Sequence, residues 1–309
     1  MQIFFGTSIS DSQKNDFKKT PISEFIQESL QIDRFSDGEI LPLFKNSIRD
    51  EDIFFIQTPQ SSDEIIETLL VVDAAKRAGC KSFTLVSPFM PYSRQDKTDH
   101  IRSSIGSKMI ADVLEKAGVT RLMTIDLHSS SIQGFYNIPV IHLNGNKVFI
   151  DYIKSLDLED ICIVAPDQGA VKRASDFCKA FPDATFAMIN KRRIKPNEVH
   201  SMELVGDVKD KNIIIVDDMA DTGGTLKKAA GLMMESGAKS VRAVATHGVL
   251  SGMAYDNINS SVLSELIVSD SISKPGISDK IKYISCSKLI SKSIVALVQK
   301  KSIHELNLV

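Results

Sequence analysis

The sequence predicts an α/β fold built from two halves, and three features of the chain support this prediction. Short apolar runs alternate with amphipathic stretches along most of the 309 residues. The runs are continuously apolar, which is typical of strands in parallel sheets that helices cover on both faces. Several amphipathic stretches end at a glycine followed by an apolar run, as at Gly79 and Gly118. Because glycine can close a helix in the left-handed conformation, these repeats indicate right-handed strand–helix–strand units.

The individual elements follow from the same patterns. Near the N-terminus we expect a strand at residues 3–6 and a helix at 22–30, whereas the polar stretch 8–19 shows no clear periodicity. Buried strands are then expected at 52–57, 83–87, 122–126, 161–165, 213–216, 241–246, 265–268 and 282–285. Helices are expected at 63–78, 103–117, 169–180, 225–236 and 288–300. A turn at Asn144-Gly145-Asn146 is the expected boundary, which gives domains of residues 1–145 and 146–309.

Composition and charge exclude several classes of protein. The 37 basic and 39 acidic side chains give a formal net charge of -2, which argues against a general nucleic-acid binder. The apolar runs are far shorter than the roughly 18 residues of a membrane span, and the first residues do not resemble a signal peptide. The four scattered cysteines favour reduced thiols over disulfides or a zinc site. We therefore expect a cytoplasmic enzyme without nucleic-acid or membrane partners.

The strongest functional motif follows the apolar run 213–216. Asp217 and Asp218 end this strand, and a loop rich in glycine and threonine then leads into a helix. The loop consists of Asp221, Thr222, Gly223, Gly224 and Thr225. Glycines allow backbone N–H groups to approach a phosphate, and the helix N-terminus adds positive potential. Because open α/β sheets bind ligands at the carboxyl ends of strands, the motif predicts a phosphate site whose carboxylates bind sugar hydroxyls or a divalent cation.

This motif resembles the ribose-5-phosphate loop of the type I phosphoribosyltransferase fold, and four further motifs narrow the resemblance. They are Arg34-Phe35-Ser36-Asp37-Gly38-Glu39, Tyr92-Ser93-Arg94-Gln95-Asp96-Lys97, Asp126-Leu127-His128 and Lys191-Arg192-Arg193. In this order and spacing they resemble the ribose-phosphate diphosphokinase (phosphoribosyl-diphosphate synthetase) family of the phosphate-activated type. The resemblance runs from about Arg34 to the C-terminus. It implies two phosphoribosyltransferase-like domains, each a mostly parallel sheet flanked by helices.

The resemblance also implies a reaction. The diphosphoryl group of Mg-ATP would pass to the anomeric hydroxyl of ribose 5-phosphate, giving 5-phosphoribosyl 1-diphosphate and AMP. Mg²⁺ would be the cofactor, and the enzyme would be a homo-oligomer, a hexamer built from dimers. Two alternatives stay open, a phosphoribosyltransferase that consumes the diphosphate and a catalytically silent regulatory subunit. The silent subunit would be expected to lack Lys191, His128 or the sugar loop, and all three are present.

The resemblance assigns roles to individual residues. The ATP site would comprise Phe35, Asp37, Gly38, Glu39, Arg94, Gln95, Asp99 and His128. His128 and Asp167 would lie around the metal, and Asp167 is the firmer direct ligand because Mg²⁺ prefers oxygen. Lys191 and Arg193 would be catalytic cations on a lid that closes over the polyphosphate. The ribose-5-phosphate site would comprise Arg193, Asp217, Asp218, Asp221, Thr222, Gly223, Gly224 and Thr225.

The resemblance further implies a regulatory site for phosphate or ADP at Ser47, Arg49 and Gln133. The alternative for the first two residues is an ordinary exposed polar turn.

The sequence departs from the family pattern in three places. Asp167 is followed by Gln168-Gly169-Ala170, where the family usually has a small residue and two glycines. Residues 103–105 lack a common proline, and the N-terminal region shows no amphipathic helix. These departures bear on the packing of the first domain and on regulation, and not on the reaction.

Overall fold

The computed structural model describes the chain except for residues 99, 193–200, 274–275, 277 and 305–309. The chain divides into two compact units, and the division falls between Asn144 and Gly145. Residues 287–304 belong to the first unit, together with residues 271–273. The sequence-based division had assigned this C-terminal segment to the second half. The last helix therefore packs with the unit that is more distant in the sequence.

The first unit is built on a parallel sheet with the strand order β1-β4-β5-β6-β7. These strands are β1 (Gln2–Phe5), β4 (Asp52–Ile56), β5 (Ser82–Val86), β6 (Arg121–Ile125) and β7 (Val140–Leu143). Its core packs helices α2 (Ser62–Arg77) and α3 (Gly106–Ala117) and the hairpin β2 (Leu30–Arg34) and β3 (Ile40–Phe44) against the sheet. Helices α1 (Asp11–Lys18) and α8 (Ser287–Val298) contact each other, and Phe17 of α1 packs on Phe5 of β1.

The second unit is built on a larger sheet with the strand order β10-β9-β8-β11-β12-β13-β14. All neighbours are parallel except β9 and β10. The strands are β8 (Ile161–Ala165), β9 (Thr185–Arg192), β10 (Ser201–Val205), β11 (Asn212–Ala220), β12 (Ser240–Gly248), β13 (Glu265–Ser269) and β14 (Ile281–Ile284). The helices are α4 (Asn146–Ser155), α5 (Val171–Cys178), α6 (Gly224–Glu235) and α7 (Ala254–Asn259).

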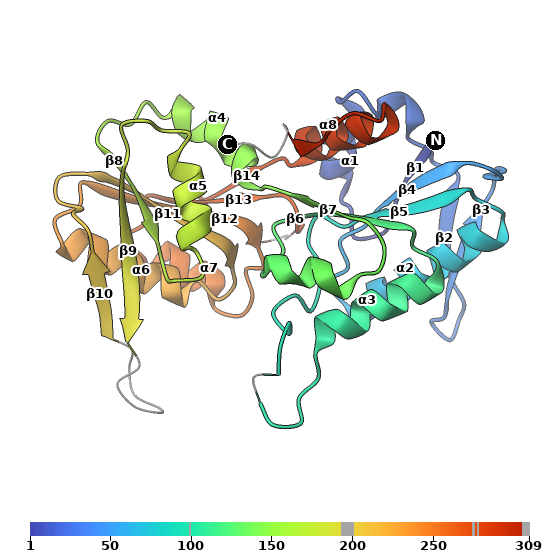
Figure 1. Cartoon of the computed structure of the whole chain (residues 1–309), viewed down its shortest axis with the longest axis horizontal. Helices are drawn as coiled ribbons and strands as arrows, with labels where there is room; N and C mark the ends of the chain where they lie inside the picture. Colours follow the sequence, from blue (N-terminus) through green and yellow to red (C-terminus); the bar gives the residue numbers. More distant parts are fainter. Residues whose placement is uncertain (99, 193–200, 274–275, 277, 305–309) are drawn as a thin grey trace. The chain divides into compact units, whose positions relative to one another are not determined.

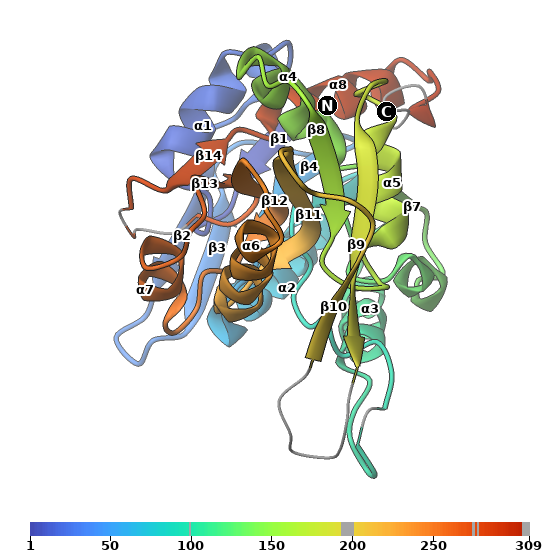
Figure 2. The ribbon, with the colours of Figure 1, turned by 90° about the vertical axis from the view of Figure 1, so that its left-hand side faces the viewer.

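Both faces of the second sheet are covered, as the continuously apolar strands predict. On β11, Ile213 and Ile215 pack with α6 and α7, whereas Ile214 and Val216 pack with α4 and α5. Figures 1 and 2 show these helices around the sheet. This burial on both sides explains why the sequence of β11 does not alternate between apolar and polar residues. The fold is thus α/β with parallel sheets flanked by helices.

Two further expectations concern the cysteines and membrane-spanning helices. The four cysteines are free thiols, as predicted. Within the described parts of the chain, every helix is too short or too polar to cross a bilayer.

In the N-terminal region the strand expected at residues 3–6 is present as β1, but the helix expected at 22–30 is not formed. A helix, α1, forms at Asp11–Lys18, and the segment 22–30 contains only a short 3₁₀ turn, η1 (Ser23–Phe25), before β2. The first turn of α1 is closed by a capping box: the Ser10 N–H donates to Gln13 Oε1 at 2.8 Å, and the Gln13 N–H donates to Ser10 Oγ at 3.4 Å. Only Gln13 and Phe17 of this helix are buried, so its apolar periodicity is too weak to detect.

Candidate active site

The acidic pair lies toward the carboxyl end of β11, in the middle of the second sheet. Asp218 is buried and Asp217 is partly buried. Burial and the neighbouring charge of Asp218 raise the pKa of Asp217 to about 8, and the charge of Asp167 contributes in the same direction. Asp167 follows the adjacent strand β8. The structure therefore brings Asp167 into the electrostatic neighbourhood of the pair, as expected for residues at neighbouring strand ends.

The backbone after Asp167 forms a tight turn into α5. Asp167 Oδ1 accepts a hydrogen bond from the Ala170 N–H at 3.2 Å. A side chain at Gly169 would lie 3.3 Å from the same oxygen, so the one retained glycine keeps this approach open. Ala170 stands where the family usually has a second glycine, and its methyl group is buried in the core with α4 and α5. The departure from the family pattern is accommodated by packing.

The glycine- and threonine-rich loop connects β11 to α6. Gly223 has a φ of 73° and caps the helix, a conformation that favours glycine. Thr222 and Thr225 are exposed. Among the described residues, none accepts a hydrogen bond from the N–H groups of Thr222, Gly223, Gly224 or Thr225. The loop thus presents backbone donors at a helix N-terminus, which is the arrangement that binds phosphate groups.

Two residues that the sequence analysis did not identify hold this loop. The Ser251 hydroxyl donates to Asp221 Oδ1, and Asn257 Nδ2 donates to the carbonyl oxygen of Thr222 at 2.9 Å. Both come from the segment between β12 and the end of α7. Their distance from the loop in sequence explains the omission, because a local pattern carries no information on such contacts.

The predicted lid begins with a strand. The pairing of β9 with β8 ends at Met188 and Ala165, but β9 continues to Arg192. Over this extension it pairs with β10, so that Lys191 lies opposite Met202. The sequence from Lys191 onward predicts a lid formed by a loop. The backbone of Lys191 is instead part of a two-stranded ribbon that passes the carboxyl end of β8. The Lys191 side chain and Arg193 lie outside the described residues.

Four predicted ATP-binding residues form the tip of the β2–β3 hairpin. The Phe35 N–H donates to the carbonyl of Glu39, and the Gly38 N–H donates to the carbonyl of Phe35, both at 2.9 Å. Asp37 Oδ1 accepts a hydrogen bond from the Glu39 N–H at 3.1 Å. The ring of Phe35 is 53% exposed. The tip therefore presents an aromatic face to solvent, as a residue that stacks on a base would require.

The remaining predicted ATP-binding residues follow β5 and β6. Arg94 and Gln95 are exposed, and the Gln95 carbonyl accepts a hydrogen bond from Ser107 Oγ at 2.8 Å, which ties the loop to α3. His128 is exposed three residues after β6, beyond the buried Asp126 with its φ of 38°. Asp99 lies outside the described residues. The structure thus places Arg94 and Gln95 in the connection after β5 and His128 in the connection after β6, and these two strands are neighbours in the sheet.

The predicted regulatory residues lie in two different connections of the first unit. Ser47 and Arg49 belong to the turn between β3 and β4, where Ser47 Oγ accepts a hydrogen bond from the Arg49 N–H at 3.4 Å. Gln133 belongs to the 3₁₀ helix η2 (Ser130–Phe135), and its Nε2 donates to the Ser130 carbonyl at 3.0 Å.

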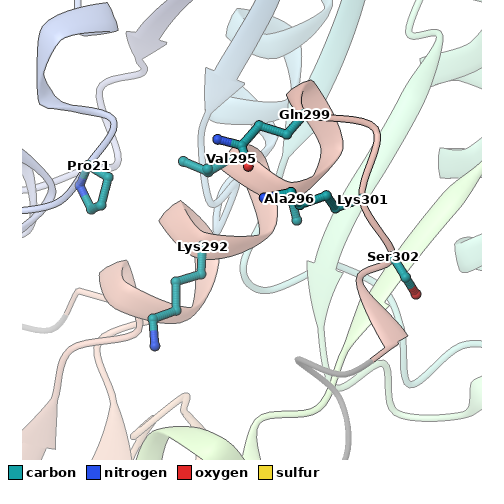
Figure 3. A pocket seen from close by; sticks show the side chains of 7 residues that line it. All are labelled: Pro21, Lys292, Val295, Ala296, Gln299, Lys301 and Ser302. Carbon is teal, nitrogen blue, oxygen red and sulfur yellow. The ribbon is translucent and has the colours of Figure 1, made fainter.

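A pocket in the described part of the chain lies apart from the predicted site residues. It has a volume of 490 Å³, lies against α8 and contains none of the predicted site residues (Figure 3). It is lined by Pro21, Lys292, Val295, Ala296, Gln299, Lys301 and Ser302. In the described part of the chain, no three or more His, Cys, Asp or Glu side chains are grouped as a metal site.

Comparison with known proteins decides the family. A model described as the N-terminal domain of ribose phosphate pyrophosphokinase matches residues 10–118. A model described as the phosphoribosyl synthetase-associated domain matches residues 179–307. The ribose-phosphate pyrophosphokinase of Porphyromonas gingivalis is 44% identical over 279 residues, which cover 90% of this chain and 89% of that protein. The chain belongs to the ribose-phosphate pyrophosphokinase family. The Bacillus caldolyticus ribose-phosphate pyrophosphokinase is 43% identical, with coverage of 89% and 88%.

The fold agrees with this family assignment. The crystal structure of phosphoribosylpyrophosphate synthetase from Mycobacterium smegmatis matches with a TM-score of 0.86 and 32% identity. The match covers 97% of this chain and 99% of that one. The pyrophosphokinase fold therefore extends over almost the whole chain, including the N-terminal region in which the sequence analysis found no helix.

Proposed function

We propose that this chain is a ribose-phosphate pyrophosphokinase, which transfers the diphosphoryl group of ATP to the anomeric hydroxyl of ribose 5-phosphate. The products are 5-phosphoribosyl 1-diphosphate and AMP. The observation that carries the proposal is the similarity to ribose-phosphate pyrophosphokinases over about nine tenths of the chain. The acidic end of β11 and the phosphate loop lie within residues 179–307, which match the synthetase-associated domain. They have the chemistry that a phosphorylated sugar requires.

The second unit provides the proposed sugar site. The 5-phosphate binds the N–H groups and hydroxyls of the loop from Asp221 to Thr225, at the N-terminus of α6. The carboxylates of Asp217 and Asp218 accept hydrogen bonds from the ribose hydroxyls, and the guanidinium of Arg193 neutralises phosphate oxygens. The elevated pKa of Asp217 supports this arrangement, because it reflects repulsion between neighbouring acidic groups. Hydrogen bonds from ligand hydroxyls, or a bound cation, would reduce this repulsion.

The first unit provides the proposed nucleotide contacts. The exposed ring of Phe35 stacks on the base, and the hairpin tip around it adds contacts from Asp37, Gly38 and Glu39. Arg94 carries positive charge toward the triphosphate, and Gln95, Asp99 and His128 complete the site.

The acidic groups fit a magnesium ion that arrives with the nucleotide. Mg²⁺ keeps several water ligands and usually binds one or two carboxylates together with substrate phosphates. A preformed cluster of three protein ligands is therefore not required. Asp167 would hold the ion through a carboxylate oxygen, and His128 would bind the ion or the triphosphate. When bound, the ion neutralises phosphate charge and polarises the reacting phosphoryl group.

Catalysis in this proposal depends on position and charge. The sugar hydroxyl attacks the β-phosphorus of ATP, the bond to the α-phosphate oxygen breaks, and the diphosphoryl group moves as a unit. No covalent intermediate with the protein is needed. Lys191 and Arg193 act on the oxygens that gain charge during transfer.

The test is to incubate the purified protein with Mg-ATP and ribose 5-phosphate and to measure AMP. A phosphoribosyltransferase would form no AMP, but would consume phosphoribosyl diphosphate when a nucleobase is supplied. A silent regulatory subunit would do neither. Formation of AMP and phosphoribosyl diphosphate in equal amounts supports the proposal, and the absence of AMP contradicts it.

Three properties of the whole enzyme belong to the same proposal. The enzyme assembles as a hexamer, which analytical ultracentrifugation tests against the chain mass of 34.0 kDa.

Phosphate activates the enzyme and ADP inhibits it through Ser47, Arg49 and Gln133. Activity that ignores phosphate, with purely competitive inhibition by ADP, would contradict this regulation. The cytoplasm is the proposed location, which the four free thiols support.

A further inference from the structure

The segment of residues 250–257, which includes the connection after β12 and the first part of α7, lies directly behind the phosphate loop. Three successive carbonyl groups at the end of β11 and the start of the loop accept hydrogen bonds from this segment: Ala220 from the Leu250 N–H at 3.0 Å, Asp221 from the Ser251 N–H at 3.1 Å, and Thr222 from Asn257 Nδ2 at 2.9 Å. The Ser251 hydroxyl also donates to the Asp221 carboxylate. A segment about thirty residues away in the sequence therefore holds the backbone of the loop one peptide group after another.

These contacts determine where the loop N–H groups point. A trans peptide group is planar, and its C=O and N–H bonds point in opposite directions. A carbonyl that is fixed toward the segment 250–257 therefore turns the N–H of the following residue away from it. The bond from Ser251 fixes the Thr222 N–H in this way, and the bond from Asn257 fixes the Gly223 N–H. Among the described residues, no acceptor takes either N–H.

The packing behind the loop leaves little room for a different orientation. A Cβ atom at Gly223 would lie 3.2 Å from the carbonyl oxygen of Ala254 and 3.2 Å from Ile258 Cδ1, both on α7. Ala254 and Ile258 are fully buried. Helices α6 and α7 also lie side by side in both views of the molecule (Figures 1 and 2). The start of α6 thus rests on α7.

We propose that Asn257 and Ser251 are positioning residues for the sugar phosphate, which aim the N–H groups of Thr222 and Gly223 at the 5-phosphate before it binds. The inference rests on the proposed function. Neither side chain needs to touch the substrate. Asn257 acts through the Thr222 carbonyl, and Ser251 acts through the backbone and carboxylate of Asp221. Donors that are already oriented bind the phosphate without reorganisation of the loop.

The variants Asn257→Ala and Asn257→Asp separate this role from general stability. Both remove the amide donor, and Asn257→Asp does so with almost no change of shape. Asp256→Ala is the matched control, because Asp256 is exposed on the same helix and its side chain has no bond to the loop. The dissociation constant of ribose 5-phosphate is measured by calorimetry. KM for both substrates, kcat and the melting temperature are measured on the same proteins.

Loss of one oriented hydrogen bond to a charged phosphate should raise the dissociation constant roughly tenfold in Asn257→Ala. Asn257→Asp should weaken binding more, because its carboxylate faces the Thr222 carbonyl and adds negative charge near the phosphate. Ser251→Ala keeps the N–H bond to the Asp221 carbonyl and loses only the hydroxyl bond to the Asp221 carboxylate, so it should weaken binding less than Asn257→Ala. In all three variants, KM for ATP and the melting temperature should stay close to the values of the wild type and of Asp256→Ala.

Unchanged affinity for ribose 5-phosphate in both Asn257 variants would overturn the inference. So would equal weakening of both substrates together with a lower melting temperature, since that pattern indicates a structural role. A wild-type protein that binds ribose 5-phosphate without forming AMP would contradict the proposed function only, and the calorimetric comparison would still decide the inference. A wild-type protein that binds no ribose 5-phosphate would overturn both.

Discussion

Lys191 carries the charge on which the proposed chemistry depends most. A cation that reaches the transferring group mainly in the transition state raises kcat more than it tightens substrate binding. Loss of one such group commonly costs about 100- to 1000-fold in rate. We therefore expect Lys191→Ala to lower kcat by at least this factor, while KM for ATP and ribose 5-phosphate changes little. Steady-state kinetics of AMP formation provides the measurement.

The neighbouring cations provide the comparison for this prediction. Arg193→Ala should lower kcat in the same way, because the two residues are assigned to adjacent oxygens of the polyphosphate. Arg192→Ala removes the same charge from the position between them and should have little effect. A weakened affinity for ATP with an intact kcat in Lys191→Ala would show that the lysine anchors the ground state, and the proposed lid mechanism would be wrong.

Asp217 should make the stability of the substrate-free protein depend on pH. Its pKa is raised to about 8 in the folded chain from an ordinary value of 3.8. The folded state then binds the proton more tightly, so the contribution to stability is complete below the ordinary pKa and is lost as the pH rises through about 8. Asp217→Asn should remove this loss. In the absence of divalent cations, its melting temperature should exceed that of wild type at pH 8 and match it near pH 4.

The exposed Asp210 provides a control for the Asp217 experiment. It lies in a turn with a φ of 59°, a conformation that asparagine tolerates. Asp210→Asn therefore removes one negative charge without backbone strain, and its melting temperature should follow that of wild type across the pH range. An Asp217→Asn protein with the same pH dependence as wild type would contradict the raised pKa.

The residues of the proposed sugar site form a local sequence pattern, whereas the residues that hold them do not. Asp217, Asp218 and the loop that follows are contiguous, and a strand end followed by glycines is a local pattern. Ser251 and Asn257 stand about thirty residues further along, and nothing in their immediate sequence relates them to the loop. Their contribution depends on the parallel pairing of β11 and β12, which brings the two connections to the same edge of the sheet.

At the level of helices and strands, the apolar pattern of the sequence predicted many of the elements whose apolar side chains are buried. All the predicted buried strands are present, and the helices expected at 63–78, 103–117, 169–180, 225–236 and 288–300 correspond to α2, α3, α5, α6 and α8. Elements with few buried residues were missed, such as α1 and the ribbon strand β10, and so were α4, β7 and β9, although these contain fully buried residues such as Phe149 and Ile189. In α1 the capping box of Ser10 and Gln13 was the available signal, and it is independent of periodicity.

Helix α2 is joined to the sheet by a buried carboxylate. Glu67 is 1% exposed, and its Oε1 accepts hydrogen bonds from the Thr7 N–H and from Gln57 Nε2, both at 2.9 Å. Its Oε2 accepts from the Thr7 hydroxyl. Glu67→Ala should leave the buried Gln57 amide without this acceptor and lower the unfolding free energy by about 1–3 kcal/mol. Urea denaturation followed by circular dichroism measures this change.

Glu67→Gln tests whether hydrogen bonding or negative charge matters at this position. The amide keeps one oxygen as an acceptor, and its nitrogen can donate to the Thr7 hydroxyl, which can reverse its own bond. The loss of stability should therefore be much smaller than in the alanine variant. Asp73→Ala on the same helix breaks only an exposed ion pair with Arg77 and should change little. Equal losses in Glu67→Gln and Glu67→Ala would indicate a requirement for the charge.

For the molecule as a whole, the sequence does not show with which unit the last helix packs. The pattern of α8 indicates that Leu289, Ile290 and Ile294 are buried. Periodicity shows that a helix face is covered and does not show what covers it. In the structure α8 packs beside α1, and Ser291 Oγ donates to Thr20 Oγ1 at 2.8 Å. The first unit is therefore completed by residues from the opposite end of the chain.

This arrangement predicts which fragments fold alone. All seven strands of the second sheet and the helices on both of its faces lie between Gly145 and Cys286. A fragment of residues 145–286 should therefore be folded and unfold cooperatively, because its core is complete without α8. A fragment of residues 1–144 lacks the helix that covers part of its apolar surface. It should be less stable, and a peptide of residues 287–304 added in trans should raise its melting temperature.

Thermal unfolding followed by circular dichroism tests each fragment. A fragment of residues 145–304 is the control, because it carries α8 without the first unit. An unfolded 145–286 fragment, or a 1–144 fragment that the peptide does not stabilise, would contradict the assignment of α8 to the first unit.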